Sequence, residues 1–598
     1  MQWSKLTFFA KAIIVLLIAG TVGGLVYYFS PGLRVGESKQ LQGLDVSDKD
    51  VNNVSSTKEF PLPQDEQSSV VADKPLVRIA GYAWNAQSAL IVANGGSRTS
   101  AGSLMEQNGV NLEIIRQDWL SELRNLHLKF IEQYDQGNAN PKEGVCAVVI
   151  MGDGAPYYIS SVQQALDDKY GAGKYTLQVV GAVGLSFGED KLIGPPSWKM
   201  DPQTMKGSLI SAVMGDGDWV VAVNYASING LKINPDPSTY DATAVNFIPS
   251  ANDDYIEAAK ELIKSQKEGW TIPLKEVKDG KLTGKSINKK VDGCATWTPG
   301  DKLVFDELSG FTDVVSTKEF NNQMATVIIS VKQWAEKNPE TISGVLKASY
   351  QSSDQMKQFD SWRKVASERV AKTFNMETAD YWYNMFKGQK AEKNGISYNM
   401  GGSRVFNFAD ANQYFGITDG VNRYKAVFDQ VSRYLKELNP AGFNENVKRV
   451  VTYEEAVNLS FLKSIKNIAS GDAYAADYTK KGTKVLASGE WHITFESGRA
   501  ALRPETKDIL EQIYNLLIQA ENSKVEIVGH TDNTGTQESN YSLSQARAEA
   551  VKSYLIQKGI PSTRFQKIDG KGQDEPVGDN ATIAGKAKNR RVVVTLLN

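Results

Sequence analysis

Short apolar runs alternate with amphipathic stretches along most of the chain from Pro75 onward. The apolar runs predict strands over 76–80, 110–115, 145–150, 177–183 and 220–224. The amphipathic stretches predict helices over 119–134, 254–266, 324–336 and 453–468. In the first of these, Leu120, Leu123 and Ile131 recur on one face. Strands that alternate with helices predict an α/β domain with mostly parallel sheets.

A second pattern begins near residue 490. The residues Lys524 to Val528 alternate charged and apolar side chains as a half-buried strand does, and turn formers follow them. Further strands are expected over 491–495, 564–568 and 591–597, and helices over 504–520 and from Leu543 to Tyr554. Gly559 and Pro561 end the second helix. These elements predict a small sheet backed by helices.

The first thirty residues differ from both patterns because Leu6 to Phe29 is almost wholly apolar. As a helix this stretch is about 36 Å long, enough to cross a hydrocarbon layer of about 30 Å. Lys5 and Lys11 precede its most apolar part, so the start is expected in the cytoplasm and the rest outside it. A cleaved signal peptide is the alternative, but apolar residues continue past the small residues 20–24 and no clear cleavage site follows.

These patterns divide the chain into five segments. We expect a cytoplasmic start and membrane anchor over 1–31, a flexible tether over 32–74, an α/β domain over 75–468, a linker over 469–489 and a last domain over 490–598. We therefore expect one pass through the lipid at residues 6–29, with the bulk of the chain outside the cytoplasm.

Composition narrows the function classes. Among 598 residues, 23% are charged and the formal net charge is -2, so nucleic-acid binding is not expected. Cys146 and Cys294 lie in apolar surroundings without a nearby Cys or His at metal-ligand spacing. They predict buried thiols, and the sequence predicts neither a metal site nor a cofactor.

One acid and one base stand out near the end of the chain. Asp532 follows the strand over 524–528, and Arg547 lies in the first turns of the next helix. A carboxylate takes an ammonium group, whereas a guanidinium forks a carboxylate through two parallel hydrogen bonds. Together they would hold a zwitterion. The alternative is that residues 532–535 form only a turn and that Arg547 is a solvated helix residue.

The motifs around this pair are those of a known family. Residues 529–535 (GHTDNTG), Asn540 with residues 543–548 (LSQARA), and residues 589–592 (NRRV) occur in the order found in OmpA-like peptidoglycan-binding domains, which residues 494–598 therefore resemble. The resemblance implies an α/β sandwich in which Asp532 and Arg547 hold the free amino-acid end of diaminopimelate in cell-wall stem peptides. It also places Thr531, Asn540 and Arg590 at the ligand. Asn540 orients the ligand or only begins the helix, and Arg591 contacts the ligand or only forms a salt bridge within the fold.

The longer α/β region resembles two-lobed periplasmic solute-binding proteins, in the branch that includes nitrate-, sulfonate- and thiamine-precursor-binding proteins. The matching pieces lie at residues 82–85, 179–188, 206–208, 291–299 and 314–320. In such a fold the ligand lies between the lobes, where strand ends and helix starts meet. Candidate cleft residues are Trp84, Asn85, Asp153, Ser186, Asp218, Trp219 and Trp297. The indoles offer cation-π faces and either aspartate can take an amine, although buried tryptophans and aspartates in turns also have purely structural uses. Where that branch has a Ser-Arg pair, this chain has Ser186 and Phe187.

Two motifs resemble catalytic ones without their context. Residues 184–188 (GLSFG) fit a nucleophile elbow, but Pro195 and Pro196 follow soon and the downstream histidines belong to the last domain. Residues 279–286 (DGKLTGKS) resemble a phosphate loop with its first glycine misplaced and no preceding strand. We therefore expect a protein that is not an enzyme.

Three functions remain open from sequence. The first is a membrane-anchored periplasmic protein that binds peptidoglycan noncovalently and carries a solute-binding-like sensor or adaptor. The second is a stator-like subunit of an ion-driven motor with a membrane-protein partner, although residues 6–29 contain no Asp or Glu to carry the ion. The third is the substrate-binding component of an ABC-type transporter that delivers a small molecule.

Overall fold

The computed structural model describes residues 58–64, 74–393, 396–440, 443, 447–496 and 498–598. The predicted membrane helix over 6–29 and most of the predicted tether lie outside these residues. Within the described ranges, none of the helices has both the length and the apolar character required to cross a membrane.

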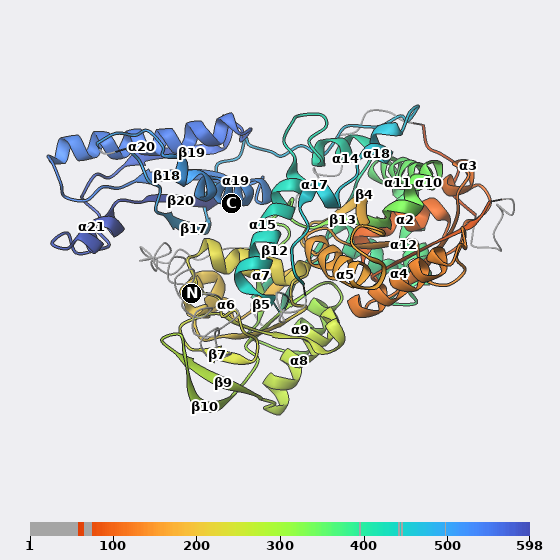
Figure 1. The fold of residues 1–598 in the computed structure, drawn as a ribbon, viewed down its shortest axis with the longest axis horizontal. Helices are drawn as coiled ribbons and strands as arrows, with labels where there is room; N and C mark the ends of the chain where they lie inside the picture. The colour runs from red at the N-terminus through yellow and green to blue at the C-terminus, as the bar shows by residue number, and fades with distance from the viewer. Residues whose placement is uncertain (1–57, 65–73, 394–395, 441–442, 444–446, 497) are drawn as a thin grey trace.

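Residues 75–468 form two lobes, each built on its own sheet. In the first lobe the strands lie in the order β16 (Ser403–Val405), β4 (Leu177–Ser186), β13 (Ala325–Val331), β3 (Ala147–Met151), β1 (Leu76–Gly81) and β2 (Asn111–Arg116). In the second lobe the order is β12 (Thr312–Ser316), β5 (Lys191–Gly194), β11 (Gly293–Thr296), β6 (Leu209–Ala212) and β8 (Asn246–Pro249). The second lobe also carries the strands β7 (Thr239–Asp241), β9 (Ile272–Lys278) and β10 (Lys281–Lys289), which project at the bottom of Figure 1.

The prediction of mostly parallel sheets needs correction, because each sheet contains a strand that runs against its neighbours. β13 is antiparallel to β3 and β4, and β5 is antiparallel to β11 and β12. β5 begins just after the chain crosses from the first lobe, and β13 just after it crosses back. A strand that begins at the boundary between the lobes runs away from that boundary. The parallel strands run toward the boundary and end there.

Helices cover both sheets. Those of the first lobe are α2 (Ser88–Asn94), α3 (Leu104–Gln107), α4 (Leu120–Asp135), α5 (Ala155–Tyr170), α10 (Lys332–Lys337), α11 (Pro339–Gln358), α12 (Asp360–Phe374), α13 (Ala379–Lys387), α14 (Phe408–Tyr414), α15 (Arg423–Leu438), α17 (Tyr453–Ala456) and α18 (Ser460–Ser464). Those of the second lobe are α6 (Pro196–Met200), α7 (Gly217–Ile228), α8 (Tyr255–Glu268) and α9 (Gly300–Glu307). A hairpin of β14 (Gln389–Lys393) and β15 (Ile396–Met400) reaches the second lobe, where Tyr398 stacks on Phe305 at 4.0 Å.

Three predicted elements are wrong. The strand expected over 220–224 lies inside α7. Residues Gly217 to Ala226 of this helix are all buried, so its apolar run lacks the 3.6-residue period of polar positions that marks a surface helix. The helix expected over 324–336 begins as strand β13, which is buried on both faces, and becomes helical only at Lys332. The helix expected over 453–468 is split into α17 and α18, because Val457 pairs with Val179 of the sheet.

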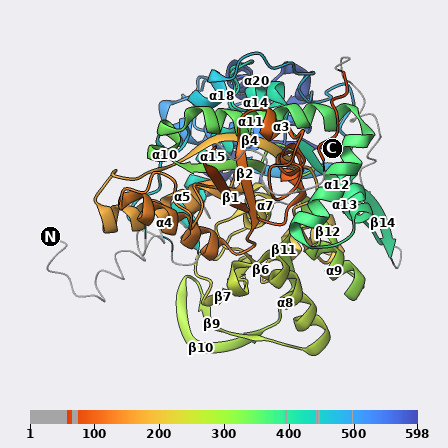
Figure 2. The same cartoon turned by 90° about the vertical axis from the view of Figure 1, so that its right-hand side faces the viewer.

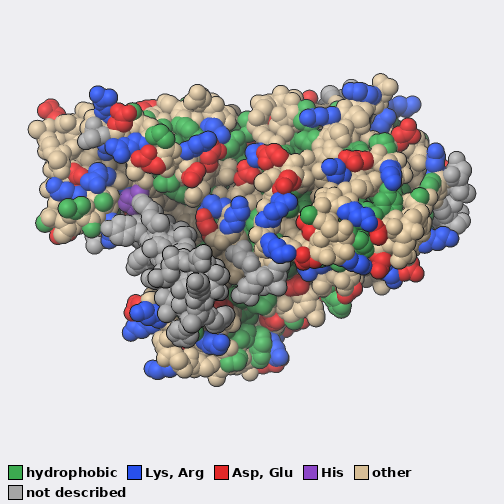
Figure 3. Space-filling view, in the orientation of Figure 1, with side chains coloured by type: hydrophobic (Ala, Val, Ile, Leu, Met, Phe, Trp, Pro, Cys, Tyr) green, Lys and Arg blue, Asp and Glu red, His purple; other side chains and the backbone are tan. Residues whose placement is uncertain are grey.

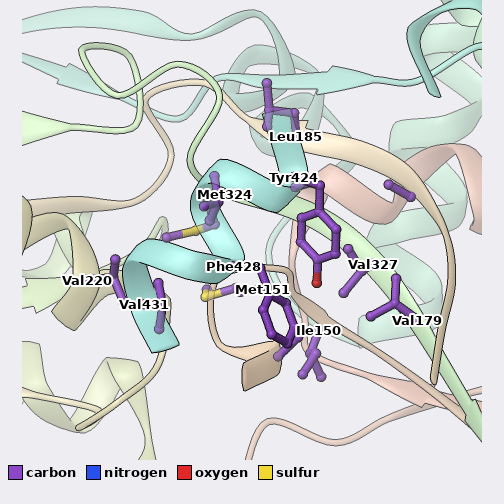
Figure 4. Close-up of a cluster of buried hydrophobic side chains, with 14 of the residues drawn as sticks. Ile150, Met151, Val179, Leu185, Val220, Met324, Val327, Tyr424, Phe428 and Val431 are labelled. Atoms are coloured by element: carbon purple, nitrogen blue, oxygen red, sulfur yellow. The ribbon is translucent and has the colours of Figure 1, made fainter. Parts of the chain in front are cut away.

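Helix α15 packs one face against the centre of the molecule. Figure 4 shows Tyr424, Phe428 and Val431 of this helix among apolar side chains of the first sheet and of α7. The Tyr424 hydroxyl donates to the Gly152 carbonyl at 3.1 Å. The helix therefore joins the core of both lobes, and its first residue, Arg423, pairs with Glu521 of the last domain.

The last domain has the predicted small sheet backed by helices. Its strands lie in the order β17 (Val485–Trp491), β20 (Val592–Leu597), β18 (Lys524–Gly529) and β19 (Phe565–Gly570). The helices α19 (Lys507–Gln519) and α20 (Gln537–Gln557) pack on it, and α21 (Ile583–Asn589) lies at the far end in Figure 1. The first strand spans Val485–Trp491, partly inside the segment expected to be linker, rather than 491–495.

Buried polar contacts join the two domains. Arg423 donates to both carboxylate oxygens of Glu521, at 3.0 and 2.9 Å. Beside this pair, Asn224 donates to Gln519 Oε1 at 2.7 Å. Figures 1 and 2 show the last domain alongside α15 rather than on an extended linker. In Figure 3, side chains of both charges are interspersed over the face shown.

Candidate functional site

Asp532 lies in the turn that follows β18. Its Oδ1 accepts from the Thr534 backbone at 2.8 Å, and its Oδ2 accepts from Arg590 Nη1 at 2.6 Å. Burial alone would raise the pKa of Asp532, but the hydrogen bonds from Arg590 and Thr534 outweigh it and hold the pKa below its usual value. The carboxylate is therefore ionised at neutral pH and ready to accept a cation.

Arg547 lies on α20 and faces the same part of the domain. Its guanidinium lies over the Phe495 ring, 4.8 Å from the ring centre, and its Nε donates to the Arg499 carbonyl at 3.3 Å. No hydrogen bond to Asp532 is present among the described residues, but the two charges interact. Partial burial, then the charge of Arg590, lowers the pKa of Arg547, whereas Asp532 raises it. The acid and the base are thus close enough for their charges to interact, without a direct hydrogen bond.

Two glycines let α20 approach the sheet closely enough to bring Arg547 to this site. A Cβ on Gly529 would lie 2.2 Å from the Ser544 carbonyl oxygen, and one on Gly570 would lie 2.3 Å from the Gln545 nitrogen. Both contacts are with backbone, so neither can be relieved by a rotamer change. Apart from the two glycines, no residue pattern predicted that α20 lies so close to the sheet.

The other predicted residues around Asp532 have distinct places. Asn540 donates to the Asp532 carbonyl at 3.2 Å and to Gln573 Oε1 at 2.9 Å, so it holds the turn. Thr531 is buried, and its hydroxyl is without a partner among the described residues. Arg590 pairs with Asp532 while nearly half of its side chain stays exposed.

The remaining residues of the last motif support the fold. Arg591 is buried and pairs with Glu490 at 3.2 Å, so its structural alternative is the one observed. Asn589 accepts from the backbones of Val577 and Gly578 at 2.8 and 2.7 Å, which fixes the loop beside the site. Sequence reasoning missed this role of Asn589, as well as Phe495 beneath Arg547.

The second candidate site is the boundary between the lobes. The residues predicted there do follow strands that end at the boundary: Trp84 and Asn85 after β1, Asp153 after β3, Ser186 at the end of β4, Asp218 and Trp219 after β6, and Trp297 after β11. All of them are buried. They differ in what they contact.

Three of these seven have structural contacts. Asn85 donates from its backbone to Glu189 and from its side chain to Ser403, both at 3.1 Å. Ser186 and Thr317 share a hydrogen bond of 2.6 Å where the chain crosses between lobes. Trp219 packs against Phe247 inside the second lobe, with ring centres 6.2 Å apart.

The others face a group of carboxylates that sequence reasoning named only in part. Asp153 accepts from Gln323 at 2.8 Å, and Asp216 accepts from the Tyr82 hydroxyl at 3.1 Å. Trp297 packs edge-on against Tyr82 and stacks on Tyr255 at 4.5 Å. Asp216 was not predicted as a site residue. It is the N-cap of α7, and aspartate is common at that position for structural reasons alone.

No group of three or more His, Cys, Asp or Glu side chains in the described part of the chain is arranged to hold a metal ion.

Comparison with known proteins assigns the last part of the chain to a known family. The OmpA family matches residues 494–590. The probable lipoprotein YiaD of Escherichia coli (strain K12) is 36% identical over 118 residues, which are 20% of this chain and 53% of that protein. The peptidoglycan-binding protein ArfA of Mycobacterium tuberculosis (strain ATCC 25618 / H37Rv) is 36% identical over 104 residues, which are 17% of this chain and 32% of that protein. The chain thus spans about half, or less, of the length of these relatives.

Among solved structures, the periplasmic nitrate-binding protein NrtA from Synechocystis PCC 6803 is similar over 65% of this chain and 87% of its own, with 11% identity and a TM-score of 0.41. The resemblance of the last domain to the OmpA family is confirmed. Residues 494–590, which carry Asp532, Arg547 and Arg590, are a domain of the OmpA family.

Proposed function

We propose that this protein binds peptidoglycan noncovalently through its OmpA domain, by holding the zwitterionic end of a stem-peptide diaminopimelate. The observation that supports the proposal is that Arg590 donates to Asp532, and that Arg547, on α20, is close enough for its charge to interact with both. The ammonium group of the ligand binds Asp532, and its carboxylate binds Arg547 with help from the exposed part of Arg590. The name of the similar protein ArfA supports this ligand class.

The test is sedimentation with purified peptidoglycan sacculi. Asp532→Asn and Arg547→Gln should each weaken binding by about 30-fold or more, because truncating one partner of a charged hydrogen-bonded pair costs about 2 kcal/mol or more. Arg503→Gln is the matched control, since Arg503 is an exposed arginine of the same domain in an ion pair with Glu505 at 3.5 Å. If both site variants sediment like the wild type, the proposed site is wrong.

Competition identifies the ligand group. Free diaminopimelate should displace the protein from sacculi, whereas 1,5-diaminopentane, which has two amines but no carboxylate, should not. Equal displacement by 1,5-diaminopentane would mean that Arg547 does not bind the carboxylate.

We further propose that the two-lobed domain is a receptor for a small solute, and that residues 6–29 anchor the chain in the inner membrane. The supporting observation for the receptor is the set of buried polar side chains that both lobes direct to their common boundary. Fractionation of cells with and without residues 1–31 tests the anchor, because the shortened chain should no longer sediment with membranes after the sacculus is digested.

A further inference from the structure

The boundary between the lobes holds far more negative than positive charge. The side chains of Asp153, Glu189, Asp190, Asp216, Asp218 and Asp301 are all buried there, as is one cation, Lys191. Lys191 pairs with Asp301 and also donates to the Asn399 carbonyl. The carboxylates other than Asp301 therefore have no cationic partner among the described residues.

Asp218 and Asp190 are the least satisfied of these carboxylates. Both are fully buried, and none of their side-chain oxygens accepts a hydrogen bond from any described residue. Burial, then repulsion from Asp190 and Asp153, raises the pKa of Asp218. A buried ionised carboxylate without a partner costs several kcal/mol, so natural proteins pair it, bind a cation there or keep it protonated.

Asp153 and Asp216 bring both lobes to the same place. A Cβ on Gly217, in the first turn of α7, would lie 3.2 Å from Asp153 Oδ1, an oxygen that also has no partner in the described structure. A Cβ on Gly154 would collide with Asp216 Oδ1. The start of α7 in the second lobe thus lies directly against the Asp153 turn of the first.

Aromatic rings lie beside these acids. Tyr82 comes from the first lobe, and Trp297 and Tyr255 come from the second, with the Tyr82 and Trp297 ring centres 5.4 Å apart. The Trp297 indole nitrogen is buried and unpartnered within the described residues. Aromatic faces with carboxylates recognise organic cations.

We infer that the solute held between the lobes is a small organic cation with a primary amine, bound by Asp218 and Asp153 against the ring of Trp297. This inference rests on the receptor role proposed above and adds the charge and chemical class of the ligand. The ammonium group fills the free acceptors of both aspartates, and the indole binds the adjoining CH₂ groups. Since these side chains are buried, the lobes separate to admit the ligand.

Thermal unfolding of the full chain tests the inference. The probes are 1,4-diaminobutane, the uncharged analogue 1,4-butanediol, sodium nitrate, and calcium and magnesium chloride, all at constant ionic strength. The diamine should raise the Tm by about 3 °C at a hundred times its Kd, and the diol should have no effect. Stabilisation by nitrate alone, or by a divalent metal alone, would overturn the assignment of an organic cation but would leave the receptor role. Stabilisation by none of the probes would overturn both the ligand class and the receptor role. Sacculus binding is measured independently of this result.

Variants locate the site. Asp218→Asn should weaken diamine binding in calorimetry by about 30-fold or more, and Asp153→Asn serves the same purpose if the first variant does not fold. The control is Asp279→Asn in the exposed turn between β9 and β10, where the positive φ of 50° is one that asparagine tolerates. Diamine binding that is unchanged in both site variants would refute the assignment.

Discussion

The contact between the two domains makes a sharp prediction at Arg423. Its guanidinium forks Glu521 of the OmpA domain through two hydrogen bonds, and the two side chains are only 8% and 13% exposed. Replacing Arg423 by Met keeps the apolar stem and removes the charge, which leaves the Glu521 carboxylate buried. Breaking one partner of a buried pair costs about 3–5 kcal/mol. The equilibrium constant for docking of the two domains should therefore fall by about two to three and a half powers of ten.

Calorimetry and proteolysis measure this loss. The wild type should unfold with the OmpA domain coupled to the two-lobed domain, whereas Arg423→Met should release a separate OmpA transition and expose residues 469–484 to cleavage. Arg433→Met is the matched control on the same helix. Its ion pair with Glu437 is a partly exposed pair one turn apart, so the change should stay near 0.5 kcal/mol.

A double-mutant cycle isolates the pair, because Arg423 also donates to carbonyls of its own lobe. Glu521→Gln and Arg423→Met should be clearly non-additive. Burial alone would raise the pKa of Glu521, but Arg423 outweighs burial and lowers it, so the stabilisation is present at neutral pH and lost as the pH falls below 4.5. Additive effects, or a cost of Arg423→Met below about 1 kcal/mol, would refute the reasoning.

Three other outcomes follow from the contacts described above. Gly529→Ala should destabilise the OmpA domain to urea by about 1–3 kcal/mol, because its Cβ would lie 2.2 Å from the Ser544 carbonyl; an unchanged midpoint would contradict this close approach. Burial raises the pKa of Cys146 to about 12 and that of Cys294 as well, so a thiol reagent at pH 8 should label both only in denaturant. The lowered pKa of Asp532 keeps it ionised under mild acid, so sacculus binding should persist from pH 7 to about 4.5 and fall only below that; a midpoint above pH 5 would argue against Asp532 as the ammonium acceptor.

Sequence reasoning located the OmpA site because its signal is local. Asp532 follows a half-buried strand whose alternation is visible, and Arg547 lies on the helix that comes next, so spacing along the chain nearly determines their separation in space. The pairing of Arg590 with Asp532 was less accessible, since 58 residues separate them. Only the family motif connected the two.

The elements of the two-lobed domain were predicted wrongly where complete burial removes the periodic pattern of apolar and polar residues. Helix α7 and strand β13 are buried on all sides, so apolar runs in both lose the pattern that distinguishes a helix from a strand. The excess of acids at the boundary was equally hidden. Asp153 and Asp218 were among the candidate cleft residues, but nothing in the sequence shows that the chain brings Asp190 and Asp216 to the same place.

The two candidate sites differ in how their charges are balanced, and this difference bears on how each works. At the OmpA site, Asp532 already has Arg590 and a backbone donor, and Arg590 remains partly open to water. Such a site is stable without ligand and needs no rearrangement to bind. At the lobe boundary, the Asp218 carboxyl group is buried and accepts no hydrogen bond from the described residues, so its ionised form is costly until a cation binds. Attachment to the wall should therefore be constant, whereas closure of the lobes should depend on the ligand.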